Sequence, residues 1–309
     1  MLDSQILKNN LEEFNENLKK RDISIDVSLL IDLDENRRKA KFEAEQIRAE
    51  QNKLGKEIAK ADKNEKEELL KKASELSNNF KSLSEKAEEE EKKFLDLWIK
   101  IPNIIDASSP VGSTDEDNKE IKKIGEVKEF KNLRDHLEIG ETLGLINVEK
   151  AAEVSGSRFS YIFGDLVKIE FNLVSYVINK LSDKGFLPTV PPVLVRENAL
   201  YGTGFFPDDA EQVYKIQNDE LYLVGTSEVS LAALHGDEIL ELDSLPLRYA
   251  GFSTCFRREA GTYGKDTTGI FRVHQFDKVE MFSFCDPEKS KEEHEYLLSV
   301  EEEILNDLE

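Results

Sequence analysis

The stretch LPLRYAGFSTCFRREAGTYGKDTTGIFRVHQFDKVEMFSF, residues 245–284, decides the fold of this 309-residue chain. Its two apolar, partly alternating ends predict a pair of strands. The run from Gly261 to Gly269 between them is polar and rich in glycine, which predicts a loop. The hairpin carries the cations Arg257, Arg258, Lys265 and Arg272 and the carboxylates Glu259 and Glu280. Cationic forks and aromatic rings on strands suit a ligand with phosphates and a flat base. An ordinary hairpin with surface ion pairs fits the same pattern equally well.

Composition narrows the class of protein. Hydrophobic residues make up 39% and charged residues 34%, and the net charge is −22, so a nucleic-acid contact would have to come from a local patch. Two cysteines and four histidines show no disulfide framework and no metal-ligand spacing, so we expect a reducing, cytoplasmic location and no protein metal site. The first residues lack the plan of a signal peptide, and no run approaches the ~20 apolar residues of a membrane span.

A heptad pattern over residues 35–101 predicts two helices that fold back at Asp62–Asn64 as an antiparallel hairpin. The spacing pairs Leu54 with Leu76, Gln51 with Phe80 and Ala44 with Ala87, on helices of about 25 residues. Residues 1–34 predict a short helix and a connector. A dimerising or tethering coiled coil is the alternative interpretation of residues 35–101.

The predicted hairpin differs in charge from the rest of the chain. Residues 35–100 hold 17 Lys and Arg against 16 Asp and Glu, while the remaining chain carries a net charge of −23. The first helix is the basic one. A locally basic rod on an acidic body can bind a phosphate backbone without the body taking part. Candidate contacts are Arg37, Arg38, Lys41, Arg48, Lys53, Lys56 and Lys60.

Residues 102–135 predict a linker with a short strand around Ile121, Ile124 and Val127. After it, Arg158–Tyr161 predicts a short strand and Leu166–Leu181 an amphipathic helix. Residues 186–195 hold three prolines, which keep an extended segment at a sheet edge. A long helix followed by such an edge strand is a plausible two-fold interface.

Near the middle of the chain, Leu221–Val224 predicts a strand that leads into Thr226, Ser227 and Glu228 at the start of a helix. Two hydroxyls and a carboxylate at that place suit either substrate recognition or an N-cap.

The sequence pattern FRREAG…GKDT.G..RVHQF.KVE resembles motif 2 of the class II aminoacyl-tRNA synthetases and is similar to the bacterial type of seryl-tRNA synthetase. The resemblance implies an α+β fold in which a coiled-coil arm precedes an antiparallel sheet with flanking helices. It implies an N-terminal tRNA-binding domain (1–101), the linker (102–135) and a catalytic domain (136–309) with motifs 1 and 2. Motif 1 implies a homodimer, and its proline falls on Pro191 or else on Pro192.

The same resemblance implies ATP-dependent activation of serine and its transfer to tRNA(Ser), and also to tRNA(Sec), with Mg²⁺ accompanying ATP. Arg257 would contact the α-phosphate and the serine carboxylate. Glu280 would hold the serine ammonium or hydroxyl, with Thr226, Ser227 and Glu228 completing the serine pocket. The expected ATP contacts are Arg257, Arg258, Glu259, Arg272, Val273 and Phe276, with the role of Arg258 in doubt. His136 and His274 receive no catalytic role.

Class II enzymes also have a third motif with an ATP-binding arginine, which this sequence lacks. We therefore expect a truncated synthetase, partial in its catalytic domain and inactive or nearly so alone. The alternatives are a tRNA-binding product without catalysis, a related ligase that loads a carrier protein, and a coiled-coil adaptor.

Overall fold

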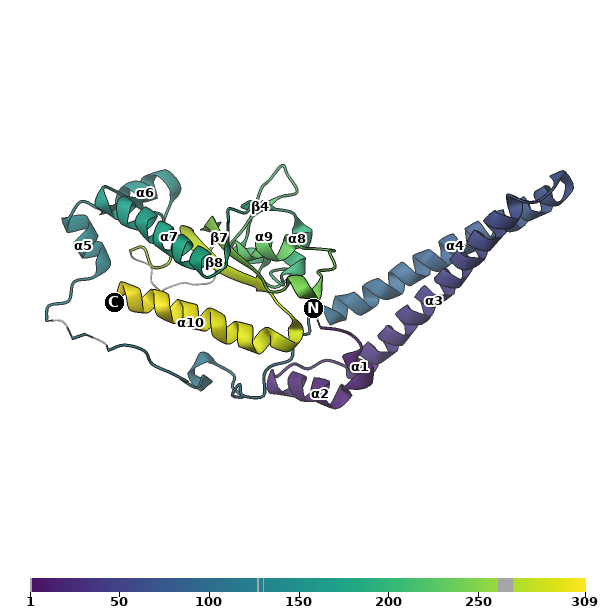
Figure 1. The fold of residues 1–309 in the computed structure, drawn as a ribbon, viewed down its shortest axis with the longest axis horizontal. Helices are drawn as coiled ribbons and strands as arrows, with labels where there is room; N and C mark the ends of the chain where they lie inside the picture. The colour runs from purple at the N-terminus through teal and green to yellow at the C-terminus, as the bar shows by residue number, and fades with distance from the viewer. Residues whose placement is uncertain (1, 127, 130, 261–268) are drawn as a thin grey trace. The chain divides into compact units, whose positions relative to one another are not determined.

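The computed structural model describes residues 2–309 except 127, 130 and 261–268, and leaves out the side chains of Lys63 and Asn64. The chain divides into two compact units, Met1–Lys122 and Lys123–Glu309 (Figure 1). The division falls within the predicted linker. Among the described residues, no helix is both long enough and apolar enough to cross a membrane.

The first unit is built on two long helices, α3 (Val27–Ile58) and α4 (Lys63–Trp98), which form the predicted hairpin. The prediction of about 25 residues per helix is wrong, because the helices have 32 and 36 residues. The expected connector before residue 35 is helical, since the Asp26 side chain accepts a hydrogen bond from the Leu29 amide and starts α3 there. At 1.5 Å per residue, the helices are roughly 48 and 54 Å long.

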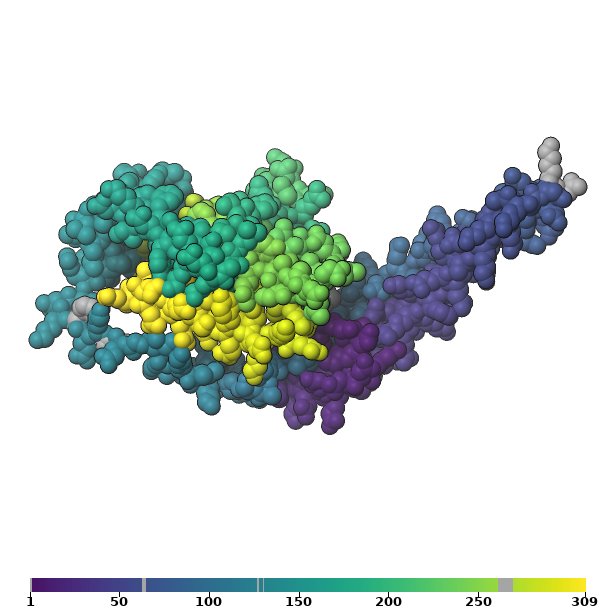
Figure 2. Space-filling model, in the orientation of Figure 1, coloured from purple at the N-terminus to yellow at the C-terminus, as the bar shows by residue number. Residues whose placement is uncertain are grey.

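The register of the hairpin follows the predicted one. The Arg48 guanidinium lies 5.1 Å from the centroid of the Phe80 ring, and Glu43 pairs with Lys86 at 3.8 Å. Ala40, Ala44 and Leu54 are buried in the seam. Figure 2 shows the hairpin as a narrow rod.

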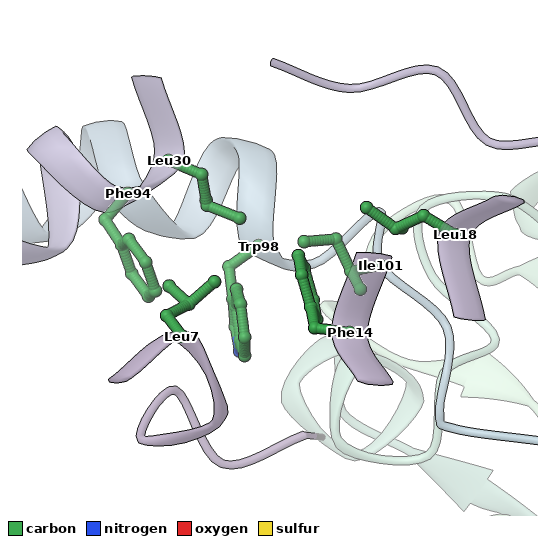
Figure 3. Packing of buried hydrophobic residues seen from close by; sticks show 7 residues of the cluster. All are labelled: Leu7, Phe14, Leu18, Leu30, Phe94, Trp98 and Ile101. Atoms are coloured by element: carbon green, nitrogen blue, oxygen red, sulfur yellow. The ribbon is translucent and has the colours of Figure 1, made fainter. Parts of the chain in front are cut away.

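Two short helices, α1 (Ile6–Asn9) and α2 (Leu11–Lys20), replace the single helix expected near the N-terminus. They close the base of the hairpin. The rings of Phe94 and Trp98 stack at 5.2 Å, and Phe14 stacks on Trp98 at 6.0 Å (Figure 3). The core of this unit consists of Leu7, Phe14, Leu18, Leu30, Phe94, Trp98 and Ile101.

The segment after residue 101 has one short 3₁₀ helix, η1 (Asp115–Asp117), and otherwise no regular structure among its described residues up to Asp135. The predicted strand around Ile121 and Ile124 is wrong; Ile121 is 93% exposed and pairs with no strand. Val127, the third residue of that prediction, lies outside the described residues.

The second unit is organised on a sheet with the strand order β3 (Leu187–Thr189), β7 (Leu247–Phe256) and β8 (Gln275–Phe284). The predicted hairpin is confirmed: β7 and β8 pair antiparallel from Leu247 opposite Phe284 to Phe256 opposite Gln275. The predicted edge strand is β3, which pairs parallel to β7. Phe271 and Val273, which the pattern placed in the second strand, precede it.

Helices α7 (Asp165–Asp183) and α10 (Ser290–Leu308) pack on one face of this sheet. The predicted helix over Leu166–Leu181 is confirmed as α7. Leu181, Phe186, Ala250 and Val300 form the buried core there. The short helix α9 (Glu228–Ala233) contacts both β7 and β8. A Cβ atom at Gly251 of β7 would lie 2.7 Å from the Leu231 side chain of α9, so any larger residue there would have to displace that side chain.

The smaller elements complete the unit. The predicted strand over Arg158–Tyr161 is displaced, because Arg158 has a left-handed φ of 62° and the strand β2 begins only at Tyr161. The predicted strand at Leu221–Val224 is confirmed as β6. The remaining bounds are α5 (His136–Thr142), β1 (Ile146–Asn147), α6 (Val148–Ser155), β2 (Tyr161–Ile162), β4 (Leu194–Val195), α8 (Glu197–Gly202), β5 (Tyr214–Lys215), β6 (Tyr222–Leu223) and the 3₁₀ helices Ala210–Gln212, Leu242–Ser244 and Pro287–Lys289.

Candidate active site and RNA-binding arm

Three polar side chains meet where β8 passes the segment between β6 and α9. The Thr226 hydroxyl donates to Glu280 Oε2 at 2.6 Å and accepts a hydrogen bond from Lys278 Nζ at 2.7 Å. Lys278 Nζ also forms an ion pair with Glu280 Oε2. Lys278 and Glu280 are two residues apart in a strand, so their side chains share one face. Thr226 is only 3% exposed.

The N-cap alternative holds only in part. Ser227 occupies the cap position of α9, but its side chain makes no capping bond; its hydroxyl instead donates to the Gly251 carbonyl at 3.5 Å. The Thr226 hydroxyl accepts the Glu228 amide at 3.2 Å, so it serves both the helix start and Glu280. The Glu228 side chain is exposed at the first turn.

Arg257, just after β7, is held against the same site. Its Nε donates to the Gly225 carbonyl at 3.1 Å, and its guanidinium lies 5.2 Å from the centroid of the Phe276 ring. Phe276 stands on β8 on the same face as Lys278 and Glu280. A cationic fork and an aromatic ring therefore lie next to the polar cluster, as recognition of a phosphate and a flat base requires.

The other predicted ATP contacts lie at the mouth of the hairpin. Arg272 Nη1 pairs with Glu259 Oε2 at 2.9 Å. Val273 lines a cavity of about 590 Å³ together with Phe276 and residues of α7. Lys265 lies outside the described residues.

Arg258 lies apart from this group. It lines a separate cavity of about 620 Å³ with Tyr214 and Tyr222, beside α8. Burial raises the pKa of Tyr214, and the positive charge of Arg258 partly offsets that rise. This placement separates Arg258 from the other expected ATP contacts.

Three positioning residues carry no predicted role in the site. His274 Nδ1 donates a hydrogen bond to the Arg257 carbonyl at 2.7 Å, and the His274 carbonyl accepts one from the Arg257 amide. His136 Nε2 accepts the Ile270 amide at 2.9 Å, in keeping with a structural role. Lys278 was missed entirely. The alternation of β8 was the signal that could have found it, because it places residue 278 between Phe276 and Glu280.

The cations of α3 fall into two groups. Arg37 pairs with Asp34 at 2.7 Å and with Glu91 at 3.2 Å and lies over the Phe94 ring, and Arg38 pairs with Asp34 at 2.8 Å. These two side chains are engaged in holding the base of the hairpin. The outward cations of the arm are Lys41, Arg48, Lys53, Lys56 and Lys60, all exposed.

Comparisons with known proteins agree with this arrangement. Residues 1–105 match the seryl-tRNA synthetase N-terminal domain, and residues 212–309 match the tRNA synthetase class II core domain (G, H, P, S and T). Serine–tRNA ligase 1 of Streptomyces avermitilis is 45% identical over 315 residues, which cover all of this chain and 74% of the relative. This chain belongs to the seryl-tRNA synthetase family.

Two further comparisons support membership of the same family. The serine–tRNA ligase of Thermobifida fusca is 45% identical over 91% of this chain, and the match covers 66% of that relative. The crystal structure of seryl-tRNA synthetase from Pyrococcus horikoshii complexed with ATP superposes with a TM-score of 0.82 at 36% identity, covering 100% of this chain and 75% of that one. The chain thus spans between about two thirds and three quarters of the length of these relatives.

The family implies Mg²⁺ with ATP. Within the part of the chain that the structure describes, no group of three or more His, Cys, Asp or Glu side chains could hold a metal ion.

Proposed function

We propose that this synthetase chain contains the site that activates serine with ATP before transfer to tRNA. One observation carries the proposal. The neighbouring residues Gly225 and Thr226 connect the two halves of the site, because Gly225 binds Arg257 and Thr226 binds Glu280. A phosphate-binding fork and a carboxylate for the amino acid are thereby held in one place.

The reaction joins the serine carboxylate to the α-phosphate of ATP and expels pyrophosphate. Both reactants are anionic, so the site must offset negative charge and align the attack. Arg257 would bridge the α-phosphate and the serine carboxylate, and Phe276 would stack on adenine. Glu259 would accept from the adenine amino group and Arg272 would reach the outer phosphates. Mg²⁺, bound with ATP, would neutralise phosphate charge.

Serine would bind beside Glu280, with Thr226, Ser227 and Glu228 completing the pocket. A carboxylate that accepts the substrate hydroxyl rejects alanine well, because the buried acceptor would then be unpaired. Seryl-adenylate would next transfer serine to the terminal ribose of tRNA(Ser), and of tRNA(Sec).

The arm supports the tRNA part of the proposal. Its outward lysines lie on a helical rod with a charge balance unlike the rest of the chain. Such a rod would bind the RNA backbone and recognise shape more than sequence. The exposed apolar residues of α7 and of the segment after β3 would form the interface of a homodimer, in the cytoplasm.

Serine-dependent exchange between ATP and pyrophosphate tests the proposal, on this chain and on the protein expressed from its full reading frame. We expect exchange with serine from the full reading frame, and charging of tRNA(Ser). Exchange with another amino acid but not with serine would refute the assignment of the pocket. Binding of tRNA without exchange by either protein would favour the non-catalytic alternative, and transfer to a protein instead of tRNA would favour a carrier ligase.

A further inference from the structure

Lys278 is the member of the polar cluster to which the proposed function gives no task. Its ammonium group is 2.7 Å from Thr226 Oγ1 and forms an ion pair with Glu280 Oε2. The side chain is 28% exposed, so the charge lies inside the site and not on the open surface. A lysine on the surface of a strand would ordinarily extend into water.

The contacts of the cluster are distributed unevenly between the two carboxylate oxygens of Glu280. The Thr226 hydroxyl donates to Glu280 and accepts from both Lys278 and the Glu228 amide, so its one proton and two lone pairs are all used. Both partners of the Glu280 carboxylate bind Oε2. Among the described residues, none donates a hydrogen bond to Oε1.

We propose that Lys278 is a positioning residue for serine specificity: together with Thr226 it holds Oε2 of Glu280, so that Oε1 is presented to the serine hydroxyl. The inference rests on the proposed function. A hydrogen bond from Thr226 and an ion pair with Lys278 on the same oxygen fix the rotation of the carboxyl group, which the bond from Thr226 alone would not do.

The charge of Lys278 also decides which part of serine Glu280 receives. An ammonium group already paired with the carboxylate disfavours a second ammonium on the same group, because like charges repel at short range. A neutral hydroxyl donor carries no such cost. Oε1 therefore selects the hydroxyl, the group that distinguishes serine from alanine.

The test uses Lys278→Met in the protein from the full reading frame. Steady-state exchange gives kcat and KM for serine and KM for ATP, and competition gives the inhibition constant of alanine. We expect the serine KM to rise by about tenfold, the effect of one lost charge-assisted contact. The ATP KM and the alanine constant should stay unchanged and kcat should change little. Lys278→Arg, which keeps the charge, should recover part of the serine affinity.

Two further variants complete the test. Lys278→Gln should raise the serine KM like Lys278→Met, so the conclusion does not depend on the folding of one variant. Lys150→Met, which breaks an exposed pair with Glu153 on α6, is the matched control and should behave as the wild type.

An unchanged serine KM in a folded, serine-active protein would overturn this inference and leave the proposed function intact. A parallel rise in the serine, alanine and ATP constants would also overturn it, because it would indicate general damage. Absence of serine-dependent exchange in the wild type would overturn the proposed function and this inference together.

Discussion

Arg257 and Arg258 are adjacent in the chain, yet their side chains have different surroundings. Arg257 lies over Phe276 and donates to Gly225, whereas Arg258 lines the cavity beside Tyr214. We predict that Arg257→Ala lowers the rate of serine-dependent exchange by roughly 10²–10³-fold, the usual cost of removing a donor to developing charge. Arg258→Ala is the matched control, expected within about threefold of the wild type, since small surface changes seldom matter more.

The same assay can also refute this prediction. Equal losses of exchange in Arg257→Ala and Arg258→Ala would contradict the separation of the two side chains. A further variant, Arg257→Lys, should stay impaired, because a lysine cannot bridge two anions with a planar fork.

Glu293 of α10 forms a bidentate ion pair with Arg248 of β7. Arg248 donates to both of its oxygens at 2.6 Å, and the Ser283 hydroxyl adds a bond at 2.7 Å. Hydrogen bonds from Arg248 and, to a smaller extent, Ser283 hold the pKa of Glu293 below its ordinary value, although burial acts in the opposite direction. A carboxyl group with a lowered pKa stabilises the fold above its unfolded pKa and loses this contribution as the pH falls through the folded pKa.

Glu293→Gln should therefore lower the free energy of unfolding of this unit by roughly 3 kcal/mol at neutral pH, because it leaves Arg248 without its charged partner. The difference from the wild type should shrink at acidic pH, as the pH falls through the lowered pKa of the folded carboxyl and the wild-type group also takes up a proton. Calorimetry at the two pH values checks this. Trp98, the only tryptophan, lies in the first unit, so its fluorescence transition should not move. A difference that stays constant with pH would contradict the prediction.

At the scale of the element, the arm separates paired from outward cations. Among the described residues, Lys53 and Lys56 of α3 and Lys60 just after it have no ion pair, whereas Lys71 and Lys72 of α4 pair with Glu67 and Glu68. Replacing Lys53, Lys56 and Lys60 by glutamate should weaken tRNA binding and reduce its salt dependence by up to three counterions, at about 0.9 per phosphate contact. Serine-dependent exchange should not change.

Filter binding of tRNA(Ser) at several salt concentrations measures this effect. Lys71→Glu with Lys72→Glu is the control, expected to weaken binding less because each lysine already has a carboxylate partner. If the two sets of substitutions weaken binding equally, the arm acts only through its overall charge.

The elements also show how far sequence reasoning reaches. Periodicity fixed the β7–β8 hairpin, α7 and the register of the arm, because buried apolar side chains recur at fixed intervals in each. It failed at the start of α3, where the Asp26 side chain accepts a hydrogen bond from the Leu29 amide and starts the helix earlier. Periodicity also failed at Ile121, because the apolar run there pairs with no strand in the described part of the chain. The engagement of Arg37 with Glu91 and Phe94, and the bond from Lys278 to Thr226, are contacts between segments that no local pattern contains.

At the scale of the whole molecule, the second unit exposes apolar side chains along the predicted two-fold interface. Phe171 of α7 is 64% exposed, and Val190, next to Pro191, is 81% exposed. Large exposed apolar patches mark interaction surfaces, and a specific dimer must cover about 1,000 Å² or more in total. A second copy of this chain is the partner that motif 1 implies.

Phe171→Glu should therefore shift the protein from dimer to monomer, because burial at the interface would leave the new carboxylate without a partner. Analytical ultracentrifugation over a range of concentrations measures the state. Ile239→Glu is the matched control, since Ile239 is 97% exposed and lies in a loop outside α7, and this variant should remain a dimer. A monomeric wild type, or a dimeric Phe171→Glu variant, would place the interface elsewhere. If the monomer forms and also loses serine-dependent exchange, the active site depends on the dimer; if exchange persists, each chain works alone.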